Sequence, residues 1–188
     1  MKKHLWLCLA IFLVSAPAHA VDKNAVALKG FNERVKQYVD LHKKVERGLP
    51  QDKESADPAV LVSRKQQFAR AMAAARPAAK QGDIFTPAVR PIFLRTVRAA
   101  LTGPGSAKAR EMVLGEGNPK GPESTKVPKV EVNVAYPSEA PLSTVPPSLL
   151  MALPLIPEEL EYRFIGHDLI LRDVKADLIV DYIRRAAP

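Results

Sequence analysis

Neighbouring carboxylates are the residues of this chain best placed to do acid–base chemistry. Glu158 and Glu159 are adjacent, and Asp173 and Asp177 are four residues apart. A pair of carboxylates can supply a general acid and a general base when the protein separates their pKa values. Both pairs lie beside predicted strand ends, where acids are usually solvated, and no sugar-binding pattern accompanies them. We therefore assign no catalytic residue.

Histidine and cysteine are too few to indicate metal or thiol chemistry. The single cysteine, Cys8, lies in an apolar N-terminal run. Leu7 precedes it, whereas a lipoprotein cleavage site needs a small residue there, so Cys8 is interpreted as apolar filler. Beyond residue 20 only His42 and His167 remain, in no spaced ligand motif. We expect His42 on a helix, His167 in a turn, and no metal or cofactor.

The sequence motifs that mark common enzyme classes are absent. There is no Walker loop, G-x-S-x-G, H-E-x-x-H or G-x-G-x-x-G. Residues 103–106, Gly-Pro-Gly-Ser, look like a phosphate loop only superficially, since they follow a helical pattern and no G-K-[ST] completes them. We expect a turn there, and we predict that the protein is not an enzyme.

The first twenty residues have the composition of a secretory signal peptide. Lys2 and Lys3 precede the uncharged apolar run 5–14, and residues 15–20 end in a small-x-small pattern. The apolar run is shorter than the ~20 residues that span a bilayer. We expect cleavage after Ala20 and a mature chain that is exported, periplasmic or secreted, and not membrane-spanning.

Charge is divided unevenly along the remaining chain. Residues 21–110 contain eighteen Lys and Arg against eight Asp and Glu, a net charge of +10. Residues 111–188 contain eight against twelve, a net charge of −4. The basic half could hold an anionic envelope component or an acidic protein, or it could pack against the acidic half of its own chain. Nucleic acid is not an expected partner, because of the predicted export and the lack of interleaved exposed aromatics.

Apolar spacing predicts a basic helical region over 21–113. One helix of about six turns follows the stripe from Leu28, with Gly48 after its basic last turn. Asp57-Pro58 and Thr86-Pro87 each combine an N-cap with a proline and begin a second and a third helix. Pro77 should kink or end the second helix. We expect the first two helices to form an antiparallel hairpin, the third to close its apolar seam, and a short fourth helix over 106–113.

A Pro/Gly-rich linker over 114–128 and a small β region over 129–188 are predicted to follow. Alternating side chains indicate a strand over 130–136, and strands over 160–165, 168–172 and 177–183 form a meander. Asp177 and Asp181 flank the apolar run 178–180 as charged gatekeepers. Residues 141–157 alternate proline with bulky aliphatic residues, which we expect to be buried around one helical turn at 148–152. The fold class is α+β, with a sheet of about four strands.

Several motifs carry a resemblance to known proteins. Residues 81–87 (QGDIFTP), 162–174 (YRFIGHDLILRDV) and 178–183 (LIVDYI) resemble those of a group of uncharacterised secreted bacterial proteins. The resemblance covers most of the mature chain and implies a signal peptide followed by helices and a meander, with no functional residue to transfer. The tail is also similar to the C-terminal hairpins of a periplasmic nickel/cobalt-homeostasis family, but so few histidines do not imply metal handling.

These observations favour a non-enzymatic, envelope-associated binding or structural module that uses its basic helices. The alternative is a small periplasmic hydrolase or ligand carrier, with a pocket between helices and sheet lined by Tyr162, Arg163 and Asp173. A third possibility is a homo-oligomer, a dimeric chaperone-like protein that pairs through a helical seam.

Overall fold

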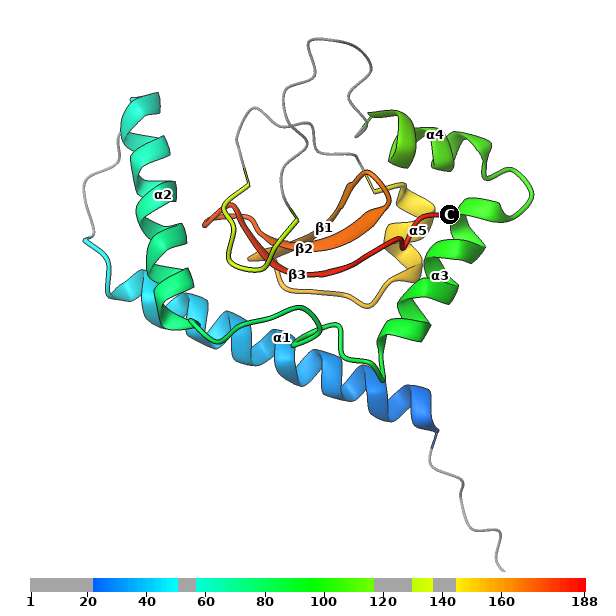
Figure 1. Cartoon of the computed structure of the whole chain (residues 1–188), viewed down its shortest axis with the longest axis horizontal. Helices are drawn as coiled ribbons and strands as arrows, with labels where there is room; N and C mark the ends of the chain where they lie inside the picture. The colour runs from blue at the N-terminus through cyan, green and yellow to red at the C-terminus, as the bar shows by residue number, and fades with distance from the viewer. Residues whose placement is uncertain (1–21, 51–56, 117–129, 137–144) are drawn as a thin grey trace, which may run out of the picture.

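The computed structural model describes residues 22–50, 57–116, 130–136 and 145–188. Helices come first along the chain and an antiparallel sheet closes it, which confirms the α+β class (Figure 1). The elements are α1 (Lys23–Arg47), α2 (Pro58–Ala75), α3 (Arg90–Thr102), α4 (Ala107–Glu116), α5 (Pro147–Ala152), β1 (Leu160–Ile165), β2 (Asp168–Asp173) and β3 (Leu178–Ile183).

Helix α1 is the longest element and runs beneath the sheet in the view of Figure 1. Asp22 caps it by accepting the backbone N–H of Asn24, which satisfies one of the unpaired amides of the first turn. Gly48 follows its last residue, as predicted. Most of the predicted apolar stripe is buried, namely Phe31, Val35, Tyr38, Val39 and His42, whereas Leu28, Leu41 and Val45 are partly buried.

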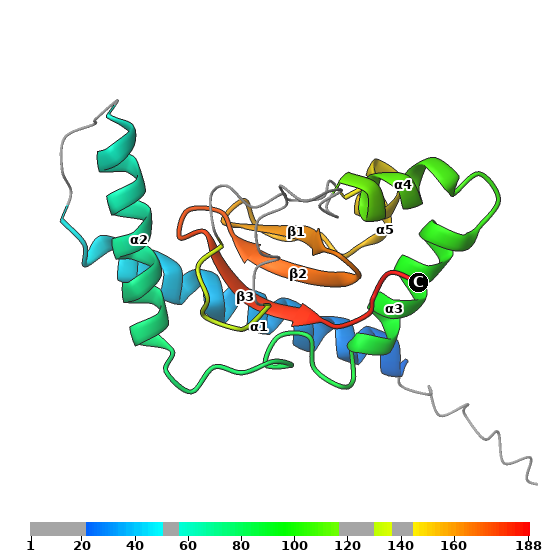
Figure 2. The same cartoon turned by 45° about the horizontal axis from the view of Figure 1, so that its top comes forward.

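Helix α2 begins where the cap-then-proline signal predicts it, with Asp57 accepting the N–H of Ala59. It ends at Ala75, just before Pro77, which cannot donate the next helical hydrogen bond. Its buried side chains are Phe68, Ala69 and Met72. Figures 1 and 2 show α2 rising away from the end of α1, so the contact expected along a hairpin is confined to the C-terminal half of α2.

Helix α3 packs against the N-terminal half of α1 rather than closing a seam between α1 and α2. Phe93 lies with its ring centroid 5.1 Å from Phe31 and 4.9 Å from Phe85. The helix begins at Arg90, so the prediction that Thr86 caps it is wrong. The N–H groups of Val89 and Arg90 instead donate to the carbonyl of Thr86, so residues 86–89 form a turn ahead of the helix.

The predicted short helices are both present. Helix α4 extends to Glu116, so the first three residues of the predicted linker are helical, and the rest of 114–128 lies outside the described residues. Helix α5 contains the helical turn predicted at 148–152. The burial expected for the aliphatic side chains of residues 141–157 is wrong for three of them, since Leu150, Met151 and Leu155 are 50%, 87% and 94% exposed.

The meander is confirmed, with strand order β1-β2-β3 and antiparallel pairing throughout. Gly166 takes a positive φ in the first turn, and Asp177 takes one just before β3. The strand predicted over 130–136 is wrong. Asn133 adopts a left-handed φ of 64°, which interrupts the extended backbone. The segment pairs with the chain around β3 through an isolated bridge, Ala135 with Leu178, and through backbone hydrogen bonds to Asp177 and Ile179. The described sheet has three strands rather than four.

The sheet buries both of its faces, because successive side chains of a strand point to opposite sides. Leu160, Tyr162 and Phe164 of β1 join a large core with α1, α3 and α5. The opposite face carries a smaller core in which Ile165 of β1 packs with residues of β2, β3 and the 130–136 segment. The sheet therefore connects the helices on one side to a second apolar layer on the other.

Candidate functional site

Asp173 is the centre of a buried polar network that joins the sheet to α1. Its side chain is inaccessible to solvent. Oδ2 lies 2.8 Å from the hydroxyl of Tyr38 and 2.6 Å from Nδ1 of His42. Oδ1 accepts the backbone N–H groups of Lys175 and Ala176. Four donors therefore surround one carboxylate, and the network holds the end of β2 against α1.

The two α1 donors are placed by helical geometry. Tyr38 and His42 are four residues apart, which puts both on the buried stripe of α1. Burial, together with the charge of Asp173, raises the pKa of Tyr38 well above its ordinary value, so its hydroxyl remains a proton donor. A carboxylate only accepts hydrogen bonds, so Nδ1 of His42 is the donor in its contact with Asp173 and carries the proton.

An aspartate that orients a histidine is an element of several hydrolytic sites. Here the second ring nitrogen of His42, Nε2, lies 3.6 Å from a carboxylate oxygen of Glu46, and the imidazole meets the Phe68 ring edge-on at 4.8 Å between centroids. His42 is 1% exposed. A general base must reach a substrate proton, and this imidazole is enclosed by protein, so the arrangement suits cohesion between β2, α1 and α2.

Asp177 does not share a site with Asp173. It forms an ion pair with Arg172, which also pairs with Glu161. Burial by itself would raise the pKa of Glu161, but hydrogen bonds from Arg163 and Arg172 outweigh it and hold the pKa below its ordinary value. Strand alternation places this cluster on the face of the sheet opposite to α1. The predicted acid pair of Asp173 and Asp177 is therefore divided between two networks.

The second predicted acid pair is also divided. Glu158 is exposed, whereas Glu159 lies 2.8 Å from Nζ of Lys43 on α1. The hydrogen bond from Lys43 lowers the pKa of Glu159. One carboxylate thus points to solvent and the other ties the start of β1 to α1.

The residues proposed for a pocket between helices and sheet do not converge. Tyr162 lies in the core on the helical side, and its hydroxyl donates to the carbonyl of Pro154. Arg163, the next residue, points to the other face and pairs with Glu161. Asp173 is enclosed by its own network. The sheet itself therefore separates Arg163 from Tyr162 and Asp173.

The other predicted positions are structural. His42 lies on a helix and His167 in the β1–β2 turn, both as predicted. Nδ1 of His167 lies 3.2 Å from the carbonyl of Ala187. Gly105 has a φ of 79°, within the turn predicted over 103–106. Within the described ranges no group of three or more His, Cys, Asp or Glu side chains is placed to hold a metal ion.

Asp181 is a buried anchor that sequence reasoning missed. It was predicted to be a charged gatekeeper at the end of a sticky strand, but it is inaccessible to solvent. Its carboxylate accepts the backbone N–H groups of Gly82, Ile84 and Phe85. It therefore fixes the loop that leads from α2 to α3. The periodicity of β3 carries no signal for this contact, because the partners are backbone amides almost a hundred residues away.

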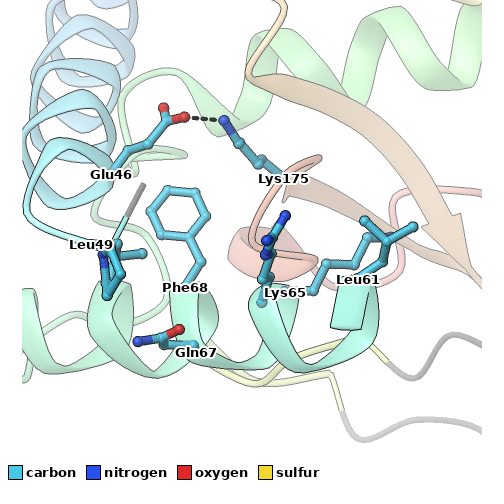
Figure 3. Close-up of a pocket in the computed structure, with 9 residues that line it drawn as sticks. Glu46, Leu49, Leu61, Lys65, Gln67, Phe68 and Lys175 are labelled. Carbon is cyan, nitrogen blue, oxygen red and sulfur yellow. Dashed lines mark hydrogen bonds and ion pairs between the residues drawn. The ribbon is translucent and has the colours of Figure 1, made fainter. Parts of the chain in front are cut away.

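A pocket of about 400 Å³ lies between the end of α1, α2 and the turn after β2 (Figure 3). Phe68, Leu49 and Leu61 provide its apolar lining. Glu46 of α1 and Lys175 of the turn form an ion pair at its edge. The remaining polar lining residues are Arg64, Lys65 and Gln67 of α2. Cations thus outnumber carboxylates around an apolar floor.

The helices present a basic surface, defined here by the exposed lysines and arginines of α1, α3 and α4. Every lysine and arginine of α1, α3 and α4 is exposed. By contrast, Glu158 is the only exposed Asp or Glu among the described residues from Val130 onward. Lys43–Glu159 is the single ion pair between a lysine or arginine of the described helices and a carboxylate of the described β region. The β region therefore does little to neutralise the helices.

Comparison with known proteins yields no family: no protein-family model, curated protein sequence or solved structure matches this chain. None of the helices in the described part of the chain is long and apolar enough to cross a membrane.

Proposed function

We propose that this protein is an exported, non-enzymatic binding module that holds an anionic partner on the basic surface of its helices. The observation that carries the proposal is the difference in exposure between the basic side chains of the helices and the acidic side chains of the β region. The cations of α1, α3 and α4 are exposed, whereas the described carboxylates of the β region, Glu158 excepted, are buried or partly buried. A surface with an excess of one sign attracts partners of the opposite sign over about a Debye length.

The charge distribution also weighs against self-neutralisation, the other interpretation of the uneven charge. If the β region neutralised the helices, its acids would face their lysines and arginines. Asp173 and Asp181 instead accept hydrogen bonds mainly from uncharged backbone and side-chain donors. Glu161 forms ion pairs with arginines of the sheet itself. The helical cations thus keep most of their charge available to a partner.

The test is co-sedimentation of the chain from Val21 to Pro188 with isolated envelope fractions at low and high salt. Binding should fall steeply between about 0.1 M and 1 M salt, where the Debye length shrinks from ~10 Å to ~3 Å. Arg98→Gln and Arg185→Gln each remove one exposed arginine, from α3 and from the residues after β3. The first should weaken binding several-fold and the second should not. Absence of binding at low salt would overturn the proposal.

A second candidate, a ligand carrier, is favoured by the pocket in Figure 3. Its apolar floor and its edge of Arg64, Lys65 and Lys175 suit a small amphiphile with a negative head group. Replacing Leu61, which is 45% exposed, with Arg would place a charge in the pocket without disturbing the core. Loss of binding of a fluorescent fatty acid by Leu61→Arg, with retention by Val174→Arg, would favour the carrier function. Equal binding of the fatty acid by both variants would rule out the carrier function at this pocket.

A further inference from the structure

Three large apolar side chains project into solvent from α5 and the segment after it. They are Leu150, Met151 and Leu155, called here the α5 surface. Met151 and Leu155, at 87% and 94%, are more exposed than any other large apolar side chain in the described residues. Residues 145–157 contain no charged side chain at all. Along the chain, no charged side chain therefore separates the three exposed apolar residues.

The backbone that carries the α5 surface is held firmly. Leu149 and Leu153, which alternate with the exposed residues, are buried in the main core. The N–H of Leu153 donates to the carbonyl of Leu149, and the carbonyl of Pro154 accepts the hydroxyl of Tyr162. The exposed side chains thus project from a fixed base. A rigid protein that exposes large apolar side chains together usually does so for a partner.

Basic segments border the α5 surface. A groove beside it is lined by Leu28 of α1, Ile92 and Thr96 of α3, and Leu155. Helix α3 contains three arginines, all exposed, and no acid: Arg90, Arg95 and Arg98. The side chain of Arg95 reaches Asn24 at the start of α1, at 3.4 Å. The apolar side chains therefore lie next to a helix that carries arginines and no acid.

We propose that the α5 surface inserts into the interfacial region of an anionic lipid bilayer while the arginines of α3 attract the lipid head groups. The inference depends on the proposed function and names its partner. Apolar side chains and neighbouring cations together are the features by which peripheral proteins bind anionic membranes. A stable protein interface usually buries ~800 Å² from about 20–30 residues on each side. Three projecting side chains bordered by charge fit a bilayer better.

The first experiment is sedimentation with phosphatidylcholine vesicles, with and without an equal part of phosphatidylglycerol. The chain starts at Val21, so that the apolar run 5–14 cannot bind lipid, and every contact described above lies within 22–188. Binding should require phosphatidylglycerol. The double variant Met151→Ser/Leu155→Ser should bind about tenfold more weakly or worse, since two side chains lose their transfer from water. Both positions are exposed, so folding should be unaffected. Val174→Ser, in the turn after β2, is the matched control.

A spectroscopic reporter tests insertion directly. Trp6 is the only tryptophan of the sequence and is absent from the chain that starts at Val21. Met151→Trp therefore introduces a single fluorophore, and Val174→Trp introduces one at a control position. Emission of the Met151→Trp variant should shift to the blue when phosphatidylglycerol vesicles are added, because indole partitions into the membrane interface. Emission of the Val174→Trp variant should not change.

The possible failures are distinguishable. If the serine variant binds vesicles as the unaltered chain does, with no blue shift at position 151, insertion is wrong while basic-surface binding survives. If the unaltered chain is a dimer and the serine variant a monomer, a second copy covers the α5 surface and the inference is overturned. If neither vesicles nor envelope fractions bind at low salt, the proposed function itself fails.

Discussion

The described β region and the helices contain charged residues in similar abundance but use them differently. In the β region Asp173, Asp181 and Glu161 are buried or half-buried, and each accepts several hydrogen bonds from its own chain. On α1, α3 and α4 the lysines and arginines are exposed. Removing a buried carboxylate leaves its donors unsatisfied, whereas removing an exposed cation leaves the fold intact. The contrast separates charges that hold the structure together from charges available to a partner.

The most damaging carboxylate substitution should be Asp173→Ala. It would leave Tyr38, His42 and two backbone amides without their acceptor in the core. We expect a loss of about 3–5 kcal/mol in the free energy of unfolding, measured by urea denaturation. Asp40→Ala is the matched control, because Asp40 is an exposed aspartate whose ion pair with Lys36 is worth at most about 1 kcal/mol. Similar losses in both variants would contradict the contrast.

Asp181→Ala should cause the next largest loss of stability, and its effect should be concentrated in the loop between α2 and α3. Its removal leaves the N–H groups of Gly82, Ile84 and Phe85 without an acceptor, at a cost of about 3 kcal/mol. Hydrogen exchange should accelerate first in residues 82–85, because the loop loses its anchor before the sheet opens. Unchanged protection of these amides would mean that the loop is held by the packing of Phe85 rather than by the carboxylate.

Local signals predicted most of the elements. The strands of the meander and the start of α2 follow from alternation and from the Asp57-Pro58 cap, which act within a few residues. The failures required long-range information. The strand predicted over 130–136 is interrupted by a left-handed residue at Asn133. The arrangement of α2 depends on which of its side chains pack into the core, and only Phe68, Ala69 and Met72 are buried.

The candidate site was harder to predict than the fold for the same reason. The contact of Asp173 with His42 joins residues 131 positions apart, and periodicity placed each on its element without relating them. Exposure of Met151 and Leu155 was not predicted because leucine and methionine are among the residue types most often buried. Only the charge asymmetry, a property of composition, pointed from the sequence toward the proposed binding surface.

Glu161→Gln should have a smaller effect that depends on pH. The arginines hold the pKa of Glu161 below its ordinary value in the folded state. Its stabilising contribution is therefore fully present above the ordinary pKa and is lost as the pH falls through the lowered one. We expect the variant to lose about 1 kcal/mol near neutral pH and almost nothing in acid. Urea titrations at several pH values measure this difference. A loss that does not depend on pH would indicate packing rather than charge.

The smallest expected effect on stability belongs to Arg98→Gln, and this is what makes the variant informative. Arg98 is exposed on α3, and removing its charge should change the free energy of unfolding by less than about 0.5 kcal/mol. The same substitution should weaken binding to phosphatidylglycerol vesicles several-fold, because each cation near an anionic surface contributes about 1 kcal/mol. Vesicle sedimentation and urea denaturation of one preparation measure both quantities. Asp173→Ala is expected to lose stability and Arg98→Gln to lose affinity, so a variant of α3 that lost both would show that the exposed cations also hold the fold together.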